Sequence, residues 1–217
     1  MQKTLVSFSF LIMLLISVSN ASAGTRWELA KSENGTKVYV RDVLGQTIKS
    51  FKGVTIIESN LSTLVAILKD TKAYTRLLHD CKSASLLKEV GLNESYTYIV
   101  TNMPWPVKDR DMVVHSLLSQ NKETKLVEIK MSATPQLVAT KQSKVRIKKM
   151  TGRWLLKPLS KDRTQVTYEM NVDPAGSLPK WLVNSISVDI PFYTLDNFRK
   201  LSTKPQYKTS KVPNIIN

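Results

Sequence analysis

Apolar and polar residues alternate most regularly in the last third of the chain. Between Thr164 and Asp173 every second residue is apolar, which predicts a β-strand with one apolar face. That face carries Val166, Tyr168, Met170 and Val172. From Pro179 onward the apolar spacing becomes that of a helix. Its apolar stripe is made of Val183, Ile186, Ile190, Tyr193 and Leu201, with Phe198 beside them. The chain therefore ends in a strand and a long amphipathic helix, and that helix needs a sheet to lie on.

Prolines mark both the start and the middle of this helix. Asp173 to Ser177 breaks the preceding strand with a proline and a glycine, and we expect Ser177 to cap the helix. Pro191 cannot donate to the carbonyl of Ser187, which costs roughly 3 kcal/mol in a helix interior. Two interpretations stay open for Pro191: a bend that follows a curved sheet, or a hinge in a lid.

The earlier part of the chain predicts a mostly antiparallel sheet interrupted by two short helices. Asn34-Gly35 between two alternating runs is typical of a β-hairpin. A third strand over 48–57 is expected to bulge or bend at Gly53, and Asn60 or Ser62 is expected to cap a helix that ends near Lys69. The remaining elements are a short helix over 73–78 and strands over 84–90, 94–101, 111–120, 125–133 and 144–156. This order predicts an α+β fold.

Two stretches carry a resemblance to a known family. The first reads Gly152-x-Trp154, Pro158, Val166-x-Tyr168, then Asp173-Pro-Ala-Gly-Ser-Leu-Pro-Lys-Trp-Leu-Val-Asn184 and Asp189-x-Pro191-x-x-Thr194-Leu195. The second runs from Asn102 to Val113 and contains Pro104-Trp105-Pro106 and Arg110-Asp111. Both resemble the START family of steroidogenic acute regulatory protein-related lipid transfer domains, from about Trp27 to Leu201. The resemblance implies a helix-grip fold, in which a curved antiparallel sheet wraps around a long C-terminal helix.

The N-terminus has the pattern of a secretory signal peptide. Lys3 precedes an apolar run from Leu5 to Val18, and Ala21-Ser22-Ala23 matches a cleavage site. We expect cleavage between Ala23 and Gly24 and a product in a bacterial periplasm or outside the cell; an N-terminal membrane anchor is the alternative. The expected domains are a signal peptide over 1–23, a START-like lipid-binding domain over 24–204 and a disordered basic tail over 205–217.

Basic residues outnumber acidic ones by 32 to 17, which gives a net charge of +15. The segment from Val138 to Arg163 contains nine basic residues and one acidic residue, Asp162. Outside the cytoplasm such a surface favours anionic lipid headgroups over nucleic acid, and we expect transient contact with an anionic membrane and no nucleic-acid partner. A merely solvated basic face is the alternative. We expect the protein to be a monomer.

A curved sheet cannot be filled along its whole length by one helix, so side chains or a ligand must occupy the space between them. Met103, Met112, Met131, Met150 and Met170 are spread over the predicted strands, and flexible methionines suit variable contents as well as ordinary cores. Together with the resemblance, this predicts a set of ligand-binding residues: Tyr98, Met103, Trp105, Arg110, Met112, Tyr168, Met170, Trp181, Val183, Ile186, Ile190 and Tyr193.

Arg110 and Trp105 are the polar and aromatic candidates with the most specific expectations. Arg110 shares strand parity with Met112, and the resemblance implies that it points into the cavity, where it could meet a phosphate or hydroxyl group of the ligand. An internal ion pair or a position on the rim is the alternative. The resemblance places Trp105 beside the cavity mouth. The residues expected to dock on a membrane are Trp105, Lys108, Lys148 and Lys149.

Enzyme chemistry has little support in the sequence. The chain has two histidines and one cysteine, and His79-x-Cys81 lacks a second pair of metal ligands. Asp111 and His115 lie four residues apart on one predicted strand, on the face opposite Arg110. We therefore expect no catalytic residue, no metal and no cofactor. The expected function is that of an exported lipid-binding or lipid-transfer protein, which holds one phospholipid, sterol or sterol-like lipid between sheet and helix. The alternative is a helix-grip enzyme, a cyclase or hydrolase, that acts on a hydrophobic substrate.

Overall fold

The computed structural model describes residues 26–46 and 48–217. Its described part contains one sheet in the order β1-β2-β3-β10-β9-β7-β6-β5-β4, with β8 paired in parallel to β6. The strands are β1 (Glu28–Glu33), β2 (Thr36–Arg41), β3 (Ser50–Ile57), β4 (Cys81–Val90), β5 (Glu94–Thr101), β6 (Arg110–Gln120), β7 (Val127–Ala133), β8 (Val145–Arg146), β9 (Lys149–Ser160) and β10 (Arg163–Asp173). The pairs on the main path are antiparallel, so the α+β prediction is confirmed.

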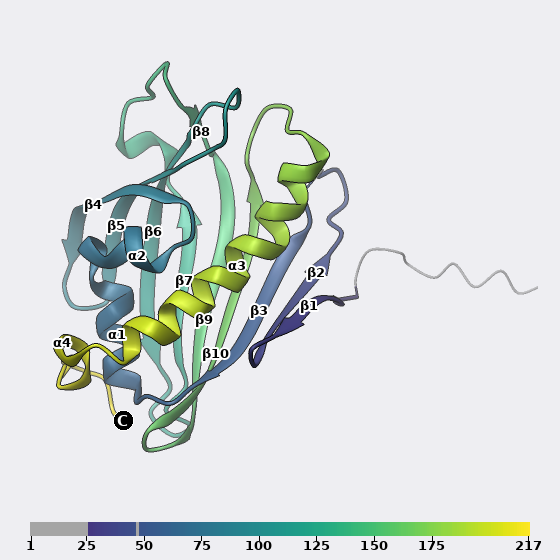
Figure 1. Cartoon of the computed structure of the whole chain (residues 1–217). Coiled ribbons are helices and arrows are strands. Elements are labelled where there is room, and N and C mark those ends of the chain that lie inside the picture. Colours follow the sequence, from purple (N-terminus) through teal and green to yellow (C-terminus); the bar gives the residue numbers. More distant parts are fainter. Residues whose placement is uncertain (1–25, 47) are drawn as a thin grey trace, which may run out of the picture.

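The helices α1, α2, α3 and α4 lie against one face of the sheet, with α3 running obliquely across it (Figure 1). They are α1 (Leu61–Lys69), η1 (Thr71–Ala73), α2 (Tyr74–Leu77), η2 (Pro135–Leu137), α3 (Lys180–Ser202) and α4 (Pro205–Lys208). The Asn60 side chain accepts a hydrogen bond from Thr63 N at 2.9 Å and so caps α1, one of the two predicted caps. The predicted cap Ser177 is wrong, because α3 begins after Pro179 and has no side-chain cap.

Two clusters of buried apolar residues form the core, and each contains residues from a different half of α3. Leu195, Phe198 and Leu201 from the C-terminal half join the larger cluster, which contains Trp154, Tyr168 and the buried apolar residues of α1. Leu182 and Ile186 from the N-terminal half join a smaller cluster with residues of β5, β6 and β10. Pro191 lies between the two halves and is itself buried. One helix therefore spans two separately packed regions.

Gly53 is the point where α3 comes closest to the sheet. A Cβ atom at Gly53 would lie 2.6 Å from Leu195 Cδ1 and 3.6 Å from Pro191 Cβ. The pairing of β3 with β2 and β10 continues through Gly53 without a register shift. The predicted bulge at Gly53 is therefore absent, and the glycine instead provides room for the helix.

The C-terminal segment is packed onto the domain, which differs from the disordered tail predicted for 205–217. Tyr207 is buried and its hydroxyl donates to Asp70 Oδ2 at 2.6 Å. Val212 and Ile215 pack against the larger cluster, and the Asn217 side chain accepts from Ser62 N at 2.8 Å. The prediction of disorder gave too much weight to the two prolines and two lysines of 205–217 and too little to these apolar residues. The predicted signal peptide over 1–23 lies outside the described residues.

None of the helices in 26–46 and 48–217 combines the length and the apolar character needed to cross a membrane.

Candidate functional site

A cavity of about 70 Å³ lies between the sheet and the N-terminal half of α3. The α3 residues Ile186, Ile190 and Thr194 form one side of it. Strand residues form the other sides: Phe51 from β3, Ile99 and Thr101 from β5, Met112 from β6, and Tyr168, Met170 and Val172 from β10. Met103, Ile147, Pro174 and the α2–β4 segment Leu78, His79 and Cys81 complete the lining. Most of these side chains are apolar, so the cavity suits a hydrophobic occupant.

Methionines connect this cavity with a second hollow deeper in the core. The second hollow has a volume of about 40 Å³ and shares Met112, Met170 and Tyr168 with the first. All five methionines singled out in the sequence line one or both hollows. Ligand pockets in proteins commonly measure roughly 300–1,000 Å³, so a whole lipid enters only if side chains or elements move. Unbranched methionine side chains are suited to such movement.

Six of the predicted ligand-binding residues line the cavity: Met103, Met112, Tyr168, Met170, Ile186 and Ile190. Sequence reasoning missed Ile99, Thr101, Ile147 and Cys81, which also line it. The positions of Ile99 and Thr101 follow from the antiparallel pairing of β5 with β6, which puts Ile99 opposite Met112. Residues opposite each other in an antiparallel pair face the same side, so Ile99 faces the cavity because Met112 does. The sequence of one strand does not show which residue of the neighbouring strand lies opposite, so this position could not be predicted.

The other predicted residues lie outside the cavity. Tyr98 is on the opposite face of β5, where its hydroxyl donates to Asp111 Oδ2 at 2.7 Å. Trp181 and Tyr193 point away from the core with 59% and 41% of their surfaces exposed, because the apolar stripe of α3 is rotated toward Leu182, Leu195 and their neighbours. Val183 lines a separate hollow beside the β2–β3 loop. Trp105 is 92% exposed.

Arg110 is buried, as predicted, but its guanidinium binds backbone carbonyls. Nη1 donates to Lys108 O at 2.7 Å, Nη2 to Ala175 O at 3.1 Å and Nε to Pro174 O at 3.3 Å. Burial lowers the pKa of Arg110. Pro174 lines the cavity and Arg110 lies behind it, so Arg110 fixes the β10–α3 connection at the cavity's edge. The predicted contact between Arg110 and a ligand has no counterpart in this cavity lining.

A buried ion pair lies on the other face of β6. Arg146 Nε and Nη2 donate to the two Asp111 oxygens at 2.9 Å each, and both side chains are almost fully buried. Burial raises the pKa of Asp111, but the hydrogen bonds from Arg146 and Tyr98 outweigh burial and the net pKa is lowered. Arg146 also donates to carbonyls of Pro135, Val138 and Ala139. The pair therefore fastens the segment 134–148 to the sheet.

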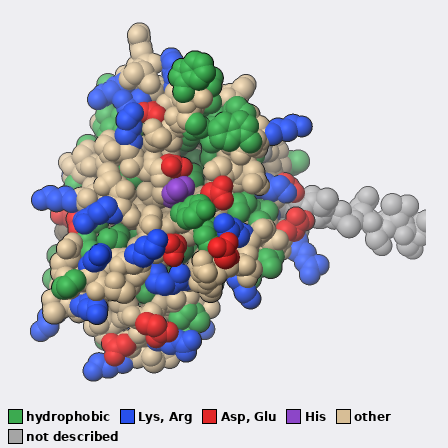
Figure 2. All heavy atoms as spheres, viewed as in Figure 1, with side chains coloured by type: hydrophobic (Ala, Val, Ile, Leu, Met, Phe, Trp, Pro, Cys, Tyr) green, Lys and Arg blue, Asp and Glu red, His purple; other side chains and the backbone are tan. Residues whose placement is uncertain are grey.

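The upper end of the molecule in Figure 1 combines exposed apolar and basic residues. The β5–β6 loop, the segment 134–148 and the β10–α3 connection meet there. Trp105, Leu137 and Trp181 are 92%, 53% and 59% exposed. Lys108, Lys148 and Lys149 are also exposed. Figure 2 shows apolar side chains at the surface of this end with Lys and Arg side chains around them. The cavity residue Met103 begins the same loop as Trp105, so this surface lies beside the cavity.

Cys81 lines the cavity, whereas His115 does not. Burial raises the pKa of the Cys81 thiol to about 11, so the thiolate is scarce near neutral pH. His115 lies on the opposite face of the sheet, 3.1 Å from Glu94 and stacked on Tyr96. Within 26–46 and 48–217 no three His, Cys, Asp or Glu side chains are grouped closely enough to hold a metal ion.

Comparisons with known proteins agree with the fold. The family model of the START domain matches residues 16–201. The chain belongs to the START domain family. An uncharacterized protein of Pseudomonas aeruginosa is 33% identical to this START protein over 200 residues, which cover 92% of this chain and 98% of that protein.

This START protein also resembles proteins whose structures have been solved. A STAR-related lipid transfer protein from Xanthomonas axonopodis is 34% identical with a TM-score of 0.75, and the match covers 82% of this chain and 99% of the other. Human START domain-containing protein 10 is 22% identical with a TM-score of 0.71, covering 83% of this chain and 74% of the other. The human structure supports the fold alone, and the helix-grip prediction is confirmed.

Proposed function

We propose that this START protein binds one hydrophobic lipid between its sheet and α3 and carries it through an aqueous space. The observation that carries the proposal is the methionine-rich apolar cavity beneath the N-terminal half of α3. Membership of the START family and the likeness to a bacterial STAR-related lipid transfer protein support it. Moving an acyl chain from a bilayer into water costs on the order of 10 kcal/mol, at about 0.8 kcal/mol per methylene. A dry cavity lowers this barrier by replacing water with apolar side chains.

Loading requires the cavity to open, and two elements are suited to opening it. The C-terminal half of α3 is anchored by Leu195 and Phe198, which have no exposed surface, while the N-terminal half covers the cavity. Pro191, which joins the halves, lacks the hydrogen bond that would stiffen the helix. The second element is the loop 103–109, held by Asp109 through Met103 N at 3.0 Å and Lys82 Nζ at 2.8 Å. We assign the gate to these two elements.

The proposal includes export and membrane contact. The sequence pattern of residues 1–23 supports cleavage of a signal peptide and delivery to the periplasm or the exterior. Trp105, Lys108, Lys148 and Lys149 lie at the end of the molecule where the gate opens, which supports docking of this end on an anionic bilayer. Docking there would let a lipid pass from the bilayer to the cavity over a short path.

Native mass spectrometry of the mature protein, purified from the host after export, tests lipid binding. We expect a bound lipid of defined mass, and extraction of lipid from vesicles by the emptied protein. Ile186→Phe fills the cavity and should reduce extraction at least fivefold. Asn184→Phe on the same helix, where Asn184 is exposed, is the matched control and should extract normally. A protein that is always empty and extracts nothing contradicts the proposal, and a bound molecule that is chemically converted favours the enzyme alternative.

A further inference from the structure

A wide hollow lies on the outer face of the sheet, the face that points away from α1, α2, α3 and α4. Its volume is about 410 Å³, within the range of roughly 300–1,000 Å³ that is common for ligand pockets. Its lining comes from Trp27 and from β2, β3, β10, β9 and β7. Ser50 and Asn171 point into it, because their neighbours Phe51 and Met170 face the core and side chains alternate along a strand.

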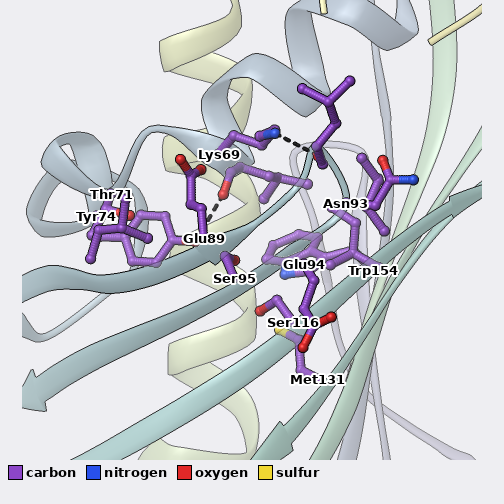
Figure 3. A pocket seen from close by; sticks show the side chains of 15 residues that line it. Lys69, Thr71, Tyr74, Glu89, Asn93, Glu94, Ser95, Ser116, Met131 and Trp154 are labelled. Carbon is purple, nitrogen blue, oxygen red and sulfur yellow. Dashed lines mark hydrogen bonds between the residues drawn. The ribbon is translucent and has the colours of Figure 1, made fainter. Parts of the chain in front are cut away.

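A smaller hollow between α1 and the β4–β5 hairpin also has polar side chains in its lining, but these are paired. Its volume is about 50 Å³. Figure 3 shows Lys69, whose Nζ donates to Leu92 O at 2.8 Å, and Glu94, which also accepts from the Tyr96 hydroxyl at 2.8 Å. Each buried side-chain oxygen and nitrogen in this lining has a hydrogen-bond partner within the described residues. Hydrogen bonding therefore does not mark this hollow as a ligand site.

The outer hollow differs, because two buried oxygen atoms in its lining have no partner. Ser50 is 2% exposed, and neither Ser50 Oγ nor Asn171 Oδ1 forms a hydrogen bond with any residue in 26–46 and 48–217. Among those residues the same holds for just one other buried side-chain atom, Gln46 Oε1. Buried polar groups in proteins are almost always paired, and leaving them unpaired lowers stability. The two oxygens therefore indicate a polar ligand in this hollow.

The hydrogen-bonding groups of the outer hollow lie in a row on successive strands. Asn171 of β10 is paired with Thr151 of β9, and Ser50 of β3 lies on the other side of Asn171. Arg41 of β2 continues the row, because it is paired with Ser50. Neighbouring strands lie roughly 4.8 Å apart, so the polar side chains are evenly spaced. Asn171 Oδ1 only accepts hydrogen bonds, whereas the Ser50 and Thr151 hydroxyls donate or accept. A ligand with several hydroxyl groups satisfies all three, but an ion that only accepts, such as sulfate, leaves Asn171 unpaired.

Two cations lie at one wall of the outer hollow without an acidic partner. Arg41 and Lys52 lie over the ring of Trp27, at 4.5 Å and 4.7 Å from its centroid, and neither forms an ion pair within the described part of the chain. At the opposite wall, Arg153 is paired with Glu169 at 2.9 Å. An acidic group on the ligand therefore meets two unpaired cations at the end of the row of polar side chains.

We propose that the outer hollow binds an acidic oligosaccharide. Ring hydroxyl groups of the ligand bind Ser50, Asn171 and Thr151, and its carboxylate or phosphate group binds Arg41 and Lys52. Neutral sugars lack the group that pairs with the two cations and bind more weakly. The site lies on the face of the sheet opposite the lipid cavity, so it goes beyond the proposed function and does not depend on it.

Binding of the purified protein to a glycan array tests this site. The array carries oligosaccharides of uronic acids, phosphorylated oligosaccharides and the neutral counterparts of both. It is read at about 0.15 M salt, where charges more than roughly 8 Å apart are largely screened. We expect binding to acidic oligosaccharides and at least tenfold weaker binding to the neutral counterparts. The acidic oligosaccharide that binds most tightly is then titrated by calorimetry to give a dissociation constant.

Four variants separate a ligand site from a structural role and from general charge attraction. Ser50→Ala and Asn171→Leu each remove an oxygen without a partner, so the melting temperature should stay the same or rise, while the affinity for the oligosaccharide falls at least fivefold. Arg41→Gln should lower the affinity at least tenfold. Arg163→Gln, in an exposed pair with Glu58 at the other end of β10, removes the same charge and should leave the affinity within twofold.

The outcomes separate this inference from the proposed function. The site is overturned if the array shows no acidic oligosaccharide bound, or if the affinity is unchanged in both Ser50→Ala and Asn171→Leu. Equal losses in Arg41→Gln and Arg163→Gln also overturn it, because they show attraction by net charge alone. Ser50→Ala and Arg41→Gln should extract lipid from vesicles like the unmodified protein. A protein that binds the oligosaccharide but extracts no lipid contradicts the proposed function and supports this site.

Discussion

Asp111 and Arg146 are the buried pair of charges that holds the segment 134–148 to the sheet. Removing one partner leaves the other charge buried without full compensation, which typically costs about 3–5 kcal/mol. Tyr98 also donates to Asp111, and three carbonyls also accept from Arg146. Because the carbonyls still partly satisfy Arg146, we expect Asp111→Asn to lower the free energy of unfolding by about 3 kcal/mol. Urea denaturation measures this loss. Asp42→Asn, in the exposed pair with Lys49, is the control and should change stability by less than about 1 kcal/mol.

The same pair predicts how stability depends on pH. The pKa of Asp111 is lower in the folded chain than its ordinary value near 4. A lowered folded pKa contributes stability that is fully present above the ordinary value and is lost as the pH falls below it toward the folded pKa. The unmodified protein should therefore lose stability more steeply below about pH 4 than Asp111→Asn. Parallel stability curves for the two proteins would show that Asp111 does not cause this part of the acid sensitivity.

At the scale of elements, the contact between β3 and α3 depends on a missing side chain. A methyl group at Gly53 would lie 2.6 Å from Leu195 Cδ1, and Leu195 is fully buried. Overpacking of this kind costs typically 1–3 kcal/mol, so Gly53→Ala should lower the free energy of unfolding by about 2 kcal/mol. Combining it with Leu195→Val, which removes the clashing atom, should cost less than the sum of the two single changes. Strict additivity in a double-mutant cycle would contradict this explanation.

Pro191 permits a test of the gate. In Pro191→Ala the helix regains a donor to the carbonyl of Ser187, so the hinge should stiffen. We expect a melting temperature higher by a few degrees and a lipid transfer rate between vesicles lower by at least threefold, with unchanged affinity. The matched change Pro205→Ala, at the start of α4, should leave transfer unaffected. If Pro191→Ala transfers lipid at the normal rate, Pro191 only shapes the helix to the sheet.

The order of elements was predictable from the sequence because each has a local cause. Asn34-Gly35 takes positive φ at both positions, and alternating apolar residues define the strands. The face that α3 turns toward the sheet was less predictable. The sequence allows an apolar face with Val183 and Tyr193 or one with Leu182 and Leu195, and the structure buries the second. Tyr98 was misplaced because strand parity depends on partners far along the chain. Which residues line the cavity therefore depends on strand register and on helix packing, and both involve residues far apart in the sequence.

At the scale of the whole molecule, the basic residues are divided between two ends. β9 runs from Lys149 to Ser160, about 36 Å at roughly 3.3 Å per residue, so Lys148 and Lys149 lie at one end of it and Lys161 follows the other. The sequence suggested one basic region over 138–163. In the structure only the N-terminal part of this basic region lies beside the cavity and the exposed Trp105. The rest lies farther away because β9 runs from one end of the sheet to the other.

This division predicts which charges matter for membrane docking. Replacing Lys108, Lys148 and Lys149 with glutamine should weaken binding to vesicles of anionic phospholipid by about tenfold or more at low salt, since each charge near such a surface contributes on the order of 1 kcal/mol. Replacing Lys122, Lys157 and Lys161, which are exposed near the opposite end, removes the same charge and should have a much smaller effect. Binding is measured by vesicle cosedimentation at two salt concentrations.

Trp105 adds a contribution that salt does not screen. Its side chain is 92% exposed in the loop that begins at the cavity residue Met103, so insertion into the bilayer interface would bury a large apolar surface next to the gate. Trp105→Ser should weaken binding to neutral and anionic vesicles alike, whereas the lysine changes at the same end should lose their effect as salt rises. Equal effects of the two lysine triples would mean that the net charge, and not this end of the molecule, directs the protein to membranes.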